Sequence, residues 1–301
     1  MEDAIDGGRA AKPLWRRIVD FPLVAMLIAV AVFVLALVAS ILIAKQLPPM
    51  DKTPGDLVQA AISIGLIWAA YKLIIRHLGE HPRDDLPLVE APKGLGLGLV
   101  FGFLLFTLVV GVAAIADVYN IIGKGGTSDL VSALIATAIL PGFMEEVLFR
   151  GILFRWLEEF GGSWLALALT SAFFGASHLM NPNASLIAAF GIAVEAGVLL
   201  GGAYMLTRNL WMAIGLHAAW NFTQGEIFDV PVSGIDQHGL VDAQLSGPQI
   251  LSGGAFGLEA SLIAMIIATA AGVALVVLAV RQGELVRPWW VMRRLARTRR
   301  F

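Results

Sequence analysis

Two adjacent carboxylates and an arginine interrupt an otherwise uncharged apolar stretch of the chain: Glu145, Glu146 and Arg150. Ionisable side chains at membrane depth are energetically costly and usually functional. Glu146 and Arg150 are four residues apart, so on a helix they share one face and can form an ion pair. Glu145 then points about 100° away from that face and has no local partner. A surface ion-pair cluster at a helix end does not explain why two acids lie inside an otherwise uncharged stretch.

A histidine in the next apolar stretch is expected at the same depth as Glu145. The first stretch continues as helix to about Phe160, and the sequence Gly-Gly-Ser that ends at Ser163 makes a turn. Fifteen residues separate Glu145 from Phe160, and fifteen separate Ser163 from His178. Both side chains therefore lie roughly 22 Å from the turn. Because an antiparallel helix pair brings them to one level, we favour a shared site over a packing role for His178.

A third polar position consists of His217 and Asn221, which are four residues apart and share one helical face. Counted from Asn209, they lie roughly 12 and 18 Å into the membrane, which is compatible with the same polar layer. The alternative is an interhelical hydrogen-bond pair that holds helices together. Glu195 is a further buried carboxylate, for which we favour a structural role. The remaining histidines lie in polar loops and are assigned no role: His77, His81 and His238.

The composition places these side chains in a membrane protein. Of the 301 residues, 58% are hydrophobic and only 15% are charged, whereas a soluble domain carries about 25% charged residues. The long apolar runs exclude a disordered chain. The absence of cysteine excludes a disulfide scaffold, an iron–sulfur cluster and a cysteine-based zinc finger.

Eight apolar segments are long enough, or nearly so, to be read as transmembrane helices. We therefore expect a single all-α polytopic membrane domain over residues 1–301, with about eight transmembrane helices around an intramembrane polar cavity. The expected spans are Phe21–Ala44, Leu57–Ile75, Leu95–Val118, Leu130–Phe154, Trp164–Leu179, Leu186–Leu206, Leu210–Phe222 and Leu258–Val280.

Lysine and arginine fall on alternate connections between these spans, which predicts the orientation of the chain. They precede the first span and follow the second, fourth, sixth and eighth, whereas residues 223–259 contain none. This pattern places both termini in the cytoplasm and favours a bacterial inner membrane. The basic tail, residues 281–301, includes Trp289 and Trp290 and is expected to lie on anionic lipid headgroups rather than to bind nucleic acid.

Small residues recur at spacing four in two of the spans, where they allow close approach of helix backbones. They are Gly94, Gly98 and Gly102 in the third span and Ala193, Gly197 and Gly201 in the sixth. We expect these rows to serve packing alone.

Three motifs occur in order on successive apolar segments: Glu145-Glu146-x-x-x-Arg150, Phe174-x-x-x-His178 and His217-x-x-x-Asn221. Together they resemble the signature of the CAAX protease and bacteriocin-processing (CPBP, or Abi) family of intramembrane proteases, which includes the Ras-converting CAAX endopeptidase. The resemblance covers residues 128–224, which we interpret as the catalytic core.

The resemblance implies an eight-helix endopeptidase whose polar cavity opens to the cytoplasmic side. It implies that Glu145 is the general base for a water that His178 holds, and that His217 and Asn221 donate hydrogen bonds to the oxyanion. Glu146, Arg150 and Phe174 would support this site. The implied substrate is a peptide or lipidated protein, cut near its C-terminus; the eukaryotic branch cuts prenylated CAAX proteins.

Metal dependence stays open at this point, because Glu145, His178 and His217 could also be three ligands of a catalytic zinc ion. We prefer a metal-free reaction that requires no cofactor. Two other functions remain as alternatives: a non-catalytic peptide-binding or bacteriocin-immunity protein, and a transporter that relays protons through Glu and His. The lack of an apparent inverted repeat weakens the transporter interpretation.

Overall fold

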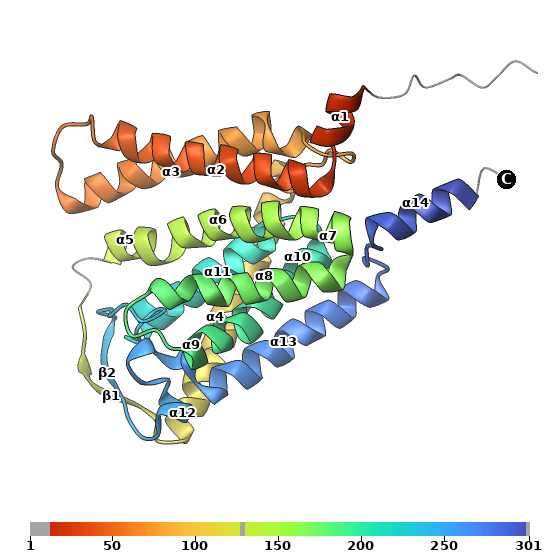
Figure 1. Cartoon of the computed structure of the whole chain (residues 1–301). Coiled ribbons are helices and arrows are strands. Elements are labelled where there is room, and N and C mark those ends of the chain that lie inside the picture. Colours follow the sequence, from red (N-terminus) through yellow and green to blue (C-terminus); the bar gives the residue numbers. More distant parts are fainter. Residues whose placement is uncertain (1–12, 127–129, 299–301) are drawn as a thin grey trace, which may run out of the picture.

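A computed structural model describes residues 13–126 and 130–298 of the chain (Figure 1). It confirms the expected all-α polytopic membrane protein. Seven of the described helical segments are long and apolar enough to cross a membrane. In Figure 1 they run side by side in one bundle, and the first and last described helices, α1 and α14, lie at the same end of it. We call this end the terminal end. Two sequence features fall outside the described residues: the basic positions Arg9 and Lys12, and the last three residues of the tail.

The seven segments are assembled from the following elements. The α-helices are α1 (Leu14–Val19), α2 (Pro22–Ala44), α3 (Lys52–Leu73), α4 (Ala91–Ile115), α5 (Leu130–Ala133), α6 (Leu140–Glu146), α7 (Arg155–Gly161), α8 (Ser163–Ser177), α9 (Leu186–Ile192), α10 (Val198–Thr207), α11 (Trp211–Phe222), α12 (Gln249–Ser252), α13 (Leu262–Arg281) and α14 (Trp289–Thr298). Wider π-helical turns, which are frequent at functional sites, span Leu134–Ile139, Val147–Phe154, Ala193–Gly197 and Thr223–Ile227. Short 3-10 turns span Ile75–His77, Leu88–Glu90, His178–Met180, Gly254–Phe256 and Leu258–Ala260.

The expected seventh span is α11, a helix of 12 residues that the π turn Thr223–Ile227 extends. It is too short to count among the seven long membrane helices. Ten of its residues are nevertheless buried, and it packs along α4. Because its neighbours rather than lipid surround it, α11 does not need the length of a helix that crosses the bilayer in contact with lipid.

The two rows of small residues allow the close helix contacts that were expected. A Cβ atom on Gly94 of α4 would lie 2.6 Å from the Cβ of Trp211 on α11. A Cβ atom on Gly197 would lie 2.6 Å from the Cβ of Ser171 on α8. Real Cβ atoms do not approach so closely, so larger side chains would push these helices apart. The packing role of both rows is confirmed.

A two-stranded antiparallel sheet lies at the end of the bundle opposite the termini, which we call the distal end (Figure 1). It pairs β1 (Tyr119–Lys124) with β2 (Val241–Leu245). This sheet was not expected from the sequence, and the expected third span extended to Val118. The helix instead ends at Ile115, because the chain turns at Asp117, whose φ is 54°, and then enters β1.

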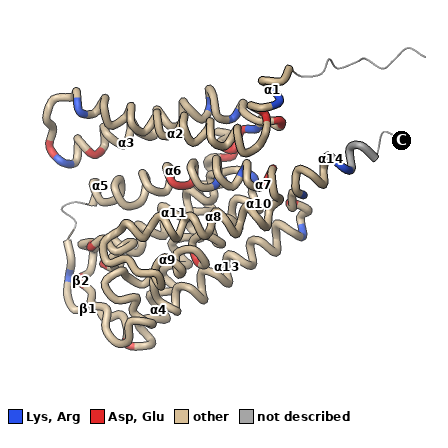
Figure 2. Tube along the Cα trace, viewed as in Figure 1, with Lys and Arg blue, Asp and Glu red and all other residues tan. Residues whose placement is uncertain are grey.

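Ion pairs at the terminal end fasten the connection between α3 and α4 to the bundle. Asp85 is fully buried there and accepts a hydrogen bond from the hydroxyl of Tyr71, 2.8 Å away. The guanidinium groups of Arg83 and Arg155 lie 2.8 and 3.7 Å from the same carboxylate. Lysines and arginines gather towards this end, as Figure 2 shows. Such pairing offsets the free energy lost when charges leave water.

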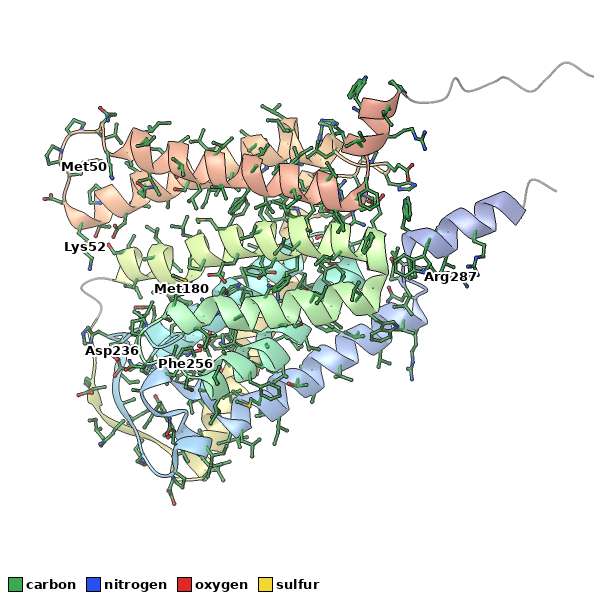
Figure 3. The ribbon with its side chains drawn as sticks, viewed as in Figure 1. Met50, Lys52, Met180, Asp236, Phe256 and Arg287 are labelled. Carbon is green, nitrogen blue, oxygen red and sulfur yellow. The ribbon has the colours of Figure 1, made fainter. Side chains whose placement is uncertain are left out.

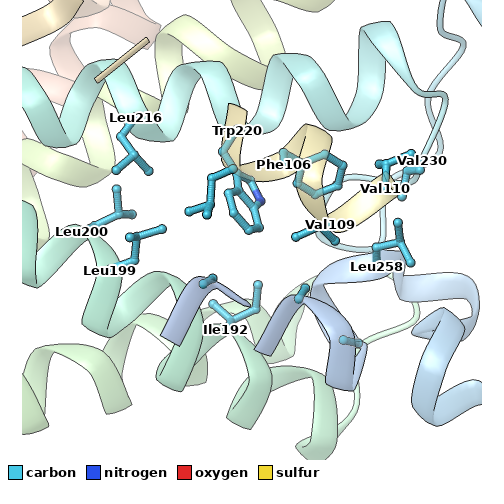
Figure 4. Packing of buried hydrophobic residues seen from close by; sticks show 14 of the residues in the cluster. Phe106, Val109, Val110, Ile192, Leu199, Leu200, Leu216, Trp220, Val230 and Leu258 are labelled. Atoms are coloured by element: carbon cyan, nitrogen blue, oxygen red, sulfur yellow. The ribbon is translucent and has the colours of Figure 1, made fainter. Parts of the chain in front are cut away.

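The apolar core that surrounds α11 holds this helix in place (Figure 4). Trp220 packs edge-on against Phe106 of α4, with 4.9 Å between ring centroids. Leu199 and Leu200 of α10 and Leu258 belong to the same buried cluster. Trp220 lies between His217 and Asn221 in the sequence, so this packing also fixes the position of both polar side chains.

Candidate active site

The first motif lies where α6 passes into the π turn Val147–Phe154. The Glu146 carboxylate oxygen Oε1 lies 2.8 Å from Nη1 of Arg150, so the expected pair between residues four apart is confirmed. Both side chains are almost fully buried. Arg150 also donates through Nη2 to the carbonyl oxygens of Ala196 and Gly197, at 3.2 and 3.4 Å. The arginine thus joins the first motif to the segment between α9 and α10.

Glu145 is on the same helix but outside this pair. Its Oε2 atom is buried and has no hydrogen-bond partner among the described residues. Its charge lies near enough to His217 and Arg150 to interact with both electrostatically. Glu145 therefore retains an uncommitted carboxylate oxygen inside the protein.

His178 follows directly on the last residue of α8 and begins a 3-10 turn. Its Nδ1 lies 2.7 Å from the carbonyl oxygen of Phe174. A carbonyl oxygen can only accept a hydrogen bond, so Nδ1 carries the proton. In the neutral ring Nε2 is then an acceptor, and it can take a hydrogen bond from a water molecule.

His217 and Asn221 lie on α11, as expected. The Nδ1 atom of His217 lies 2.9 Å from Oε1 of Glu146, the oxygen that also binds Arg150. The Nδ2 atom of Asn221 donates to the carbonyl oxygen of Thr137 at 2.8 Å. The contact between His217 and Glu146 was not expected from the sequence, because 71 residues separate the two.

Phe174 lies among the polar residues and connects the three motifs. Its ring centroid is 4.9 Å from the ring of His178 and 6.1 Å from that of His217. The guanidinium carbon of Arg150 lies 4.7 Å from the centroid. Phe149 packs edge-on against the ring at 4.9 Å. Phe149 and Phe174 are each eleven residues from the ends of the turn between Phe160 and Ser163, so the antiparallel register expected for Glu145 and His178 is present one helical turn away.

A small cavity of about 20 Å³ gathers several of these side chains. Phe174, His178, His217 and Asn221 line it, and it has room for about one water molecule. Glu145, Glu146 and Arg150 are not part of its lining. The structure thus brings together three of the four residues expected to be catalytic and leaves the fourth, Glu145, close to His217 but outside this cavity.

Glu259 also lines the cavity, although it was not among the site residues expected from the sequence. It is buried and accepts hydrogen bonds from Nε1 of Trp220 at 3.2 Å and from the backbone nitrogen and hydroxyl of Ser233 at 2.8 and 3.0 Å. Its signal in the sequence was a charge at the second position of the last expected span. Glu195 is fully buried, and neither of its oxygens has a hydrogen-bond partner among the described residues. No contact of Glu195 explains the structural role that we favoured for it.

The described side chains do not assemble the alternative zinc site. No three histidine or acidic side chains within residues 13–126 and 130–298 lie close enough together to hold a metal ion. The Nδ1 atoms of His178 and His217 are both engaged, but the Nε2 atoms do not converge with Glu145 into a ligand set. The donor set therefore does not fit a zinc ion in this conformation.

The cavity lies nearer the distal end of the bundle than the end that carries the termini. His178 lies at the distal end of α8, and Ser233 and Glu259 belong to the distal connection from α11 to α13. A larger polar pocket of about 400 Å³ lies next to the cavity, where Thr137 both lines the pocket and binds Asn221. Because α8 runs from the terminal end to the distal end before it reaches His178, the site lies near the distal end.

The comparisons with known proteins agree with the three motifs. Residues 127–223 match the family model described as type II CAAX prenyl endopeptidase Rce1-like. No curated protein and no solved structure matches the chain significantly. The matched segment contains Glu145, His178, His217 and Asn221, and the last three of these line the cavity. Over this segment the chain is similar to CAAX-type intramembrane proteases, the family that the three motifs also resemble.

Proposed function

We propose that this protein is an intramembrane endopeptidase in which Glu145 activates a water molecule for attack on a peptide bond. The observation that carries the proposal is the meeting of His178, His217 and Asn221 at one small cavity inside the membrane domain. The match of residues 127–223 to a protease family supports the same class of reaction. A cavity that holds about one water beside imidazole and amide groups is suited to hydrolysis.

We assign Glu145 the role of general base, because its buried Oε2 atom has no hydrogen-bond partner among the described residues. In the first step Glu145 takes a proton from water while the water oxygen bonds to the carbonyl carbon, and the carbonyl oxygen becomes an oxyanion. In the second step the carbonyl re-forms, the C–N bond breaks, and the proton passes from Glu145 to the leaving amine. The reaction consumes one water and needs no other co-reactant.

We assign His178 the role of holding the water molecule. Its Nδ1 donates to the carbonyl oxygen of Phe174, so Nε2 is left as an acceptor for one hydrogen atom of the water. This fixes the orientation of the water lone pair towards the substrate. The contact with Phe174 also fixes the ring, which explains why the second motif pairs a phenylalanine with the histidine.

We assign His217 and Asn221 the role of donating hydrogen bonds to the oxyanion. Nδ1 of His217 faces the carboxylate of Glu146, so Nε2 can donate only when the ring carries a second proton. Glu146 then balances the charge of the imidazolium. Asn221 uses one amide hydrogen for Thr137 and retains the other for the substrate. Removal of one such donor typically lowers the rate roughly 100- to 1000-fold.

The proposed substrate is a lipidated polypeptide. An apolar pocket of about 620 Å³ lies between α3, α4, the segment that contains α6, and α11, and its lining includes Trp68, Phe103, Phe143 and Phe222. Phe222 follows Asn221 directly in α11, so a lipid chain in this pocket would lie beside the cavity. The nearly complete apolar lining favours a hydrocarbon chain as its occupant. No step of the proposed reaction uses a metal ion.

The test is cleavage of quenched lipidated peptides by the purified full-length protein. Wild type, Glu145→Gln, His178→Ala and a control, Glu159→Gln, are compared. We expect Glu145→Gln to lower the cleavage rate at least about 100-fold, because a general base typically contributes that much or more. Glu159 accepts a hydrogen bond from His81 at the surface, so the control is expected to keep the wild-type rate. Equal rates for wild type and Glu145→Gln would refute the proposal, and binding without cleavage by wild type would favour a peptide-binding protein.

A further inference from the structure

The two ends of the bundle carry very different charges. The described connections at the distal end contain only three basic residues: Lys45, Lys52 and Lys124. Most other basic residues lie at or near the terminal end. They include Arg76, Arg83, Arg208 and Arg287 on its connections and Arg155 at the start of α7. Figure 3 shows Lys52 and Asp236 at one end of the molecule and Arg287 at the other. Lysine and arginine near membrane helices remain on the cytoplasmic side, so the terminal end is expected to face the cytoplasm.

The candidate site lies near the other, distal end. His178 is two residues from the distal end of its membrane segment, Ser163–Met180. Asn221 is the last residue but one of α11. Ser233 and Glu259, which complete the polar part of the cavity, belong to the distal connection. The neighbouring polar pocket is lined by distal residues as well, among them Asp236.

From these two observations we propose that the catalytic cavity receives its substrate from the extracytoplasmic side of the membrane. The substrate would be a lipid-anchored or otherwise membrane-bound polypeptide whose scissile bond is exposed on that side. This excludes a lipidated protein of the cytoplasm. That the cavity receives a substrate rests on the proposed protease function. The side of the membrane to which the cavity opens can be tested without any activity.

The depth of the site makes access from the cytoplasm unfavourable. His178 lies roughly 22 Å from the turn before Ser163 at the terminal end, in a hydrocarbon core that is about 30 Å thick. It is therefore only about 8 Å from the distal surface. An extended peptide that entered from the terminal end would pass through the apolar bundle with unsatisfied backbone groups, and each such group costs several kcal/mol in hydrocarbon. The distal route instead begins in the polar pocket beside Thr137.

The chain contains no cysteine, so single introduced cysteines can report the orientation without interference. Asp236→Cys is placed at the distal polar pocket, and Gln282→Cys is the matched control at the terminal end; both positions are exposed. The full-length variants are produced in the inner membrane of a bacterial host and treated with a membrane-impermeant maleimide. Ile235→Cys, also exposed and in the same pocket, provides a second distal position.

We expect the distal cysteines to be labelled in intact spheroplasts and Gln282→Cys to be labelled only after the membrane is opened. Labelling of Gln282→Cys but not of the distal positions in intact spheroplasts would overturn the proposal, as would labelling of both ends or of neither. The result is independent of catalysis. If the distal positions are labelled but wild type cleaves no peptide, the sidedness stands and the protease assignment fails. If wild type cleaves but the labelling is reversed, the protease assignment stands and the sidedness fails.

Discussion

The carboxylate of Glu146 is predicted to be the group on which the stability of the site most depends. One of its oxygens, Oε1, accepts from Nη1 of Arg150 at 2.8 Å and from Nδ1 of His217 at 2.9 Å. Both Glu146 and Arg150 are at most 1% exposed. The substitution Glu146→Gln keeps the shape and one neutral acceptor oxygen but removes the negative charge. It leaves the guanidinium of Arg150 buried without an anionic partner from Glu146, with two backbone carbonyls and the neutral amide oxygen as acceptors.

The expected loss of unfolding free energy is about 3 kcal/mol. Removal of one partner of a buried ion pair typically costs about 3–5 kcal/mol, and the neutral oxygen that remains places this variant at the lower end. Replacement of both charges by apolar residues is often nearly neutral, because no buried charge is left without a partner. The double variant Glu146→Leu with Arg150→Met should therefore recover most of the stability lost in the single variant.

The free energy of unfolding is measured by denaturant titration of the purified variants in detergent. Glu159→Gln is the control, because Glu159 binds His81, whose side chain is 81% exposed, and surface pairs contribute about 0–1 kcal/mol. We expect catalytic activity to be lost in both the single and the double variant, since His217 loses its carboxylate partner in each. The reasoning would be refuted if Glu146→Gln were no less stable than Glu159→Gln, or if the double variant were less stable than the single one.

Three further predictions follow from the packing, from a surface ion pair and from the proposed reaction. Gly98→Ala should destabilise the protein by about 1–3 kcal/mol, because the added Cβ would overlap the backbone of α11. In the control Gly96→Ala the added Cβ meets no atom within 4 Å, so this variant should be nearly neutral. Denaturant titration of both variants measures the difference. Burial would raise the pKa of Asp84. Hydrogen bonds from Lys72 and from the backbone N–H of Leu86, together with the positive charges of Lys72 and Arg76, instead hold this pKa below 3.8. Its contribution to stability is therefore complete above pH 3.8 and declines as the pH falls through the lower folded value, a decline that Asp84→Asn should remove from the pH dependence of unfolding. Peptide cleavage should survive a strong zinc chelator, and loss of activity that added zinc restores would contradict the metal-free reaction.

Local spacing along the chain determines several features of this protein. The ion pair of Glu146 with Arg150 follows from a separation of four residues on a helix. The close packing at Gly94 and Gly197 follows from small residues at the same spacing. Composition and the length of the apolar runs predict a helical membrane protein, because lipid cannot satisfy backbone polar groups and only a few architectures remain.

Contacts between distant segments could not be predicted in this way. His217 binds Glu146 across 71 residues, and β1 pairs with β2 across more than one hundred residues. Glu259 reaches the cavity because the distal connection folds back over α11, where Trp220 and Ser233 bind it. Such contacts depend on how several helices pack at once, and no single segment carries that information.

The position of the site along the bundle shows most clearly which features follow from the sequence and which from the tertiary structure. The sequence alone determined which connections carry the arginines, because that pattern is a count along the chain. It also determined how far His178 lies from the turn before α8. Only the tertiary structure decided that the polar pocket and the connection with Ser233 and Glu259 meet the cavity at the distal end. The physical reason is that helical periodicity fixes the depth and face of each side chain, whereas the packing of separate helices decides which depths are joined into one cavity and to which surface that cavity leads.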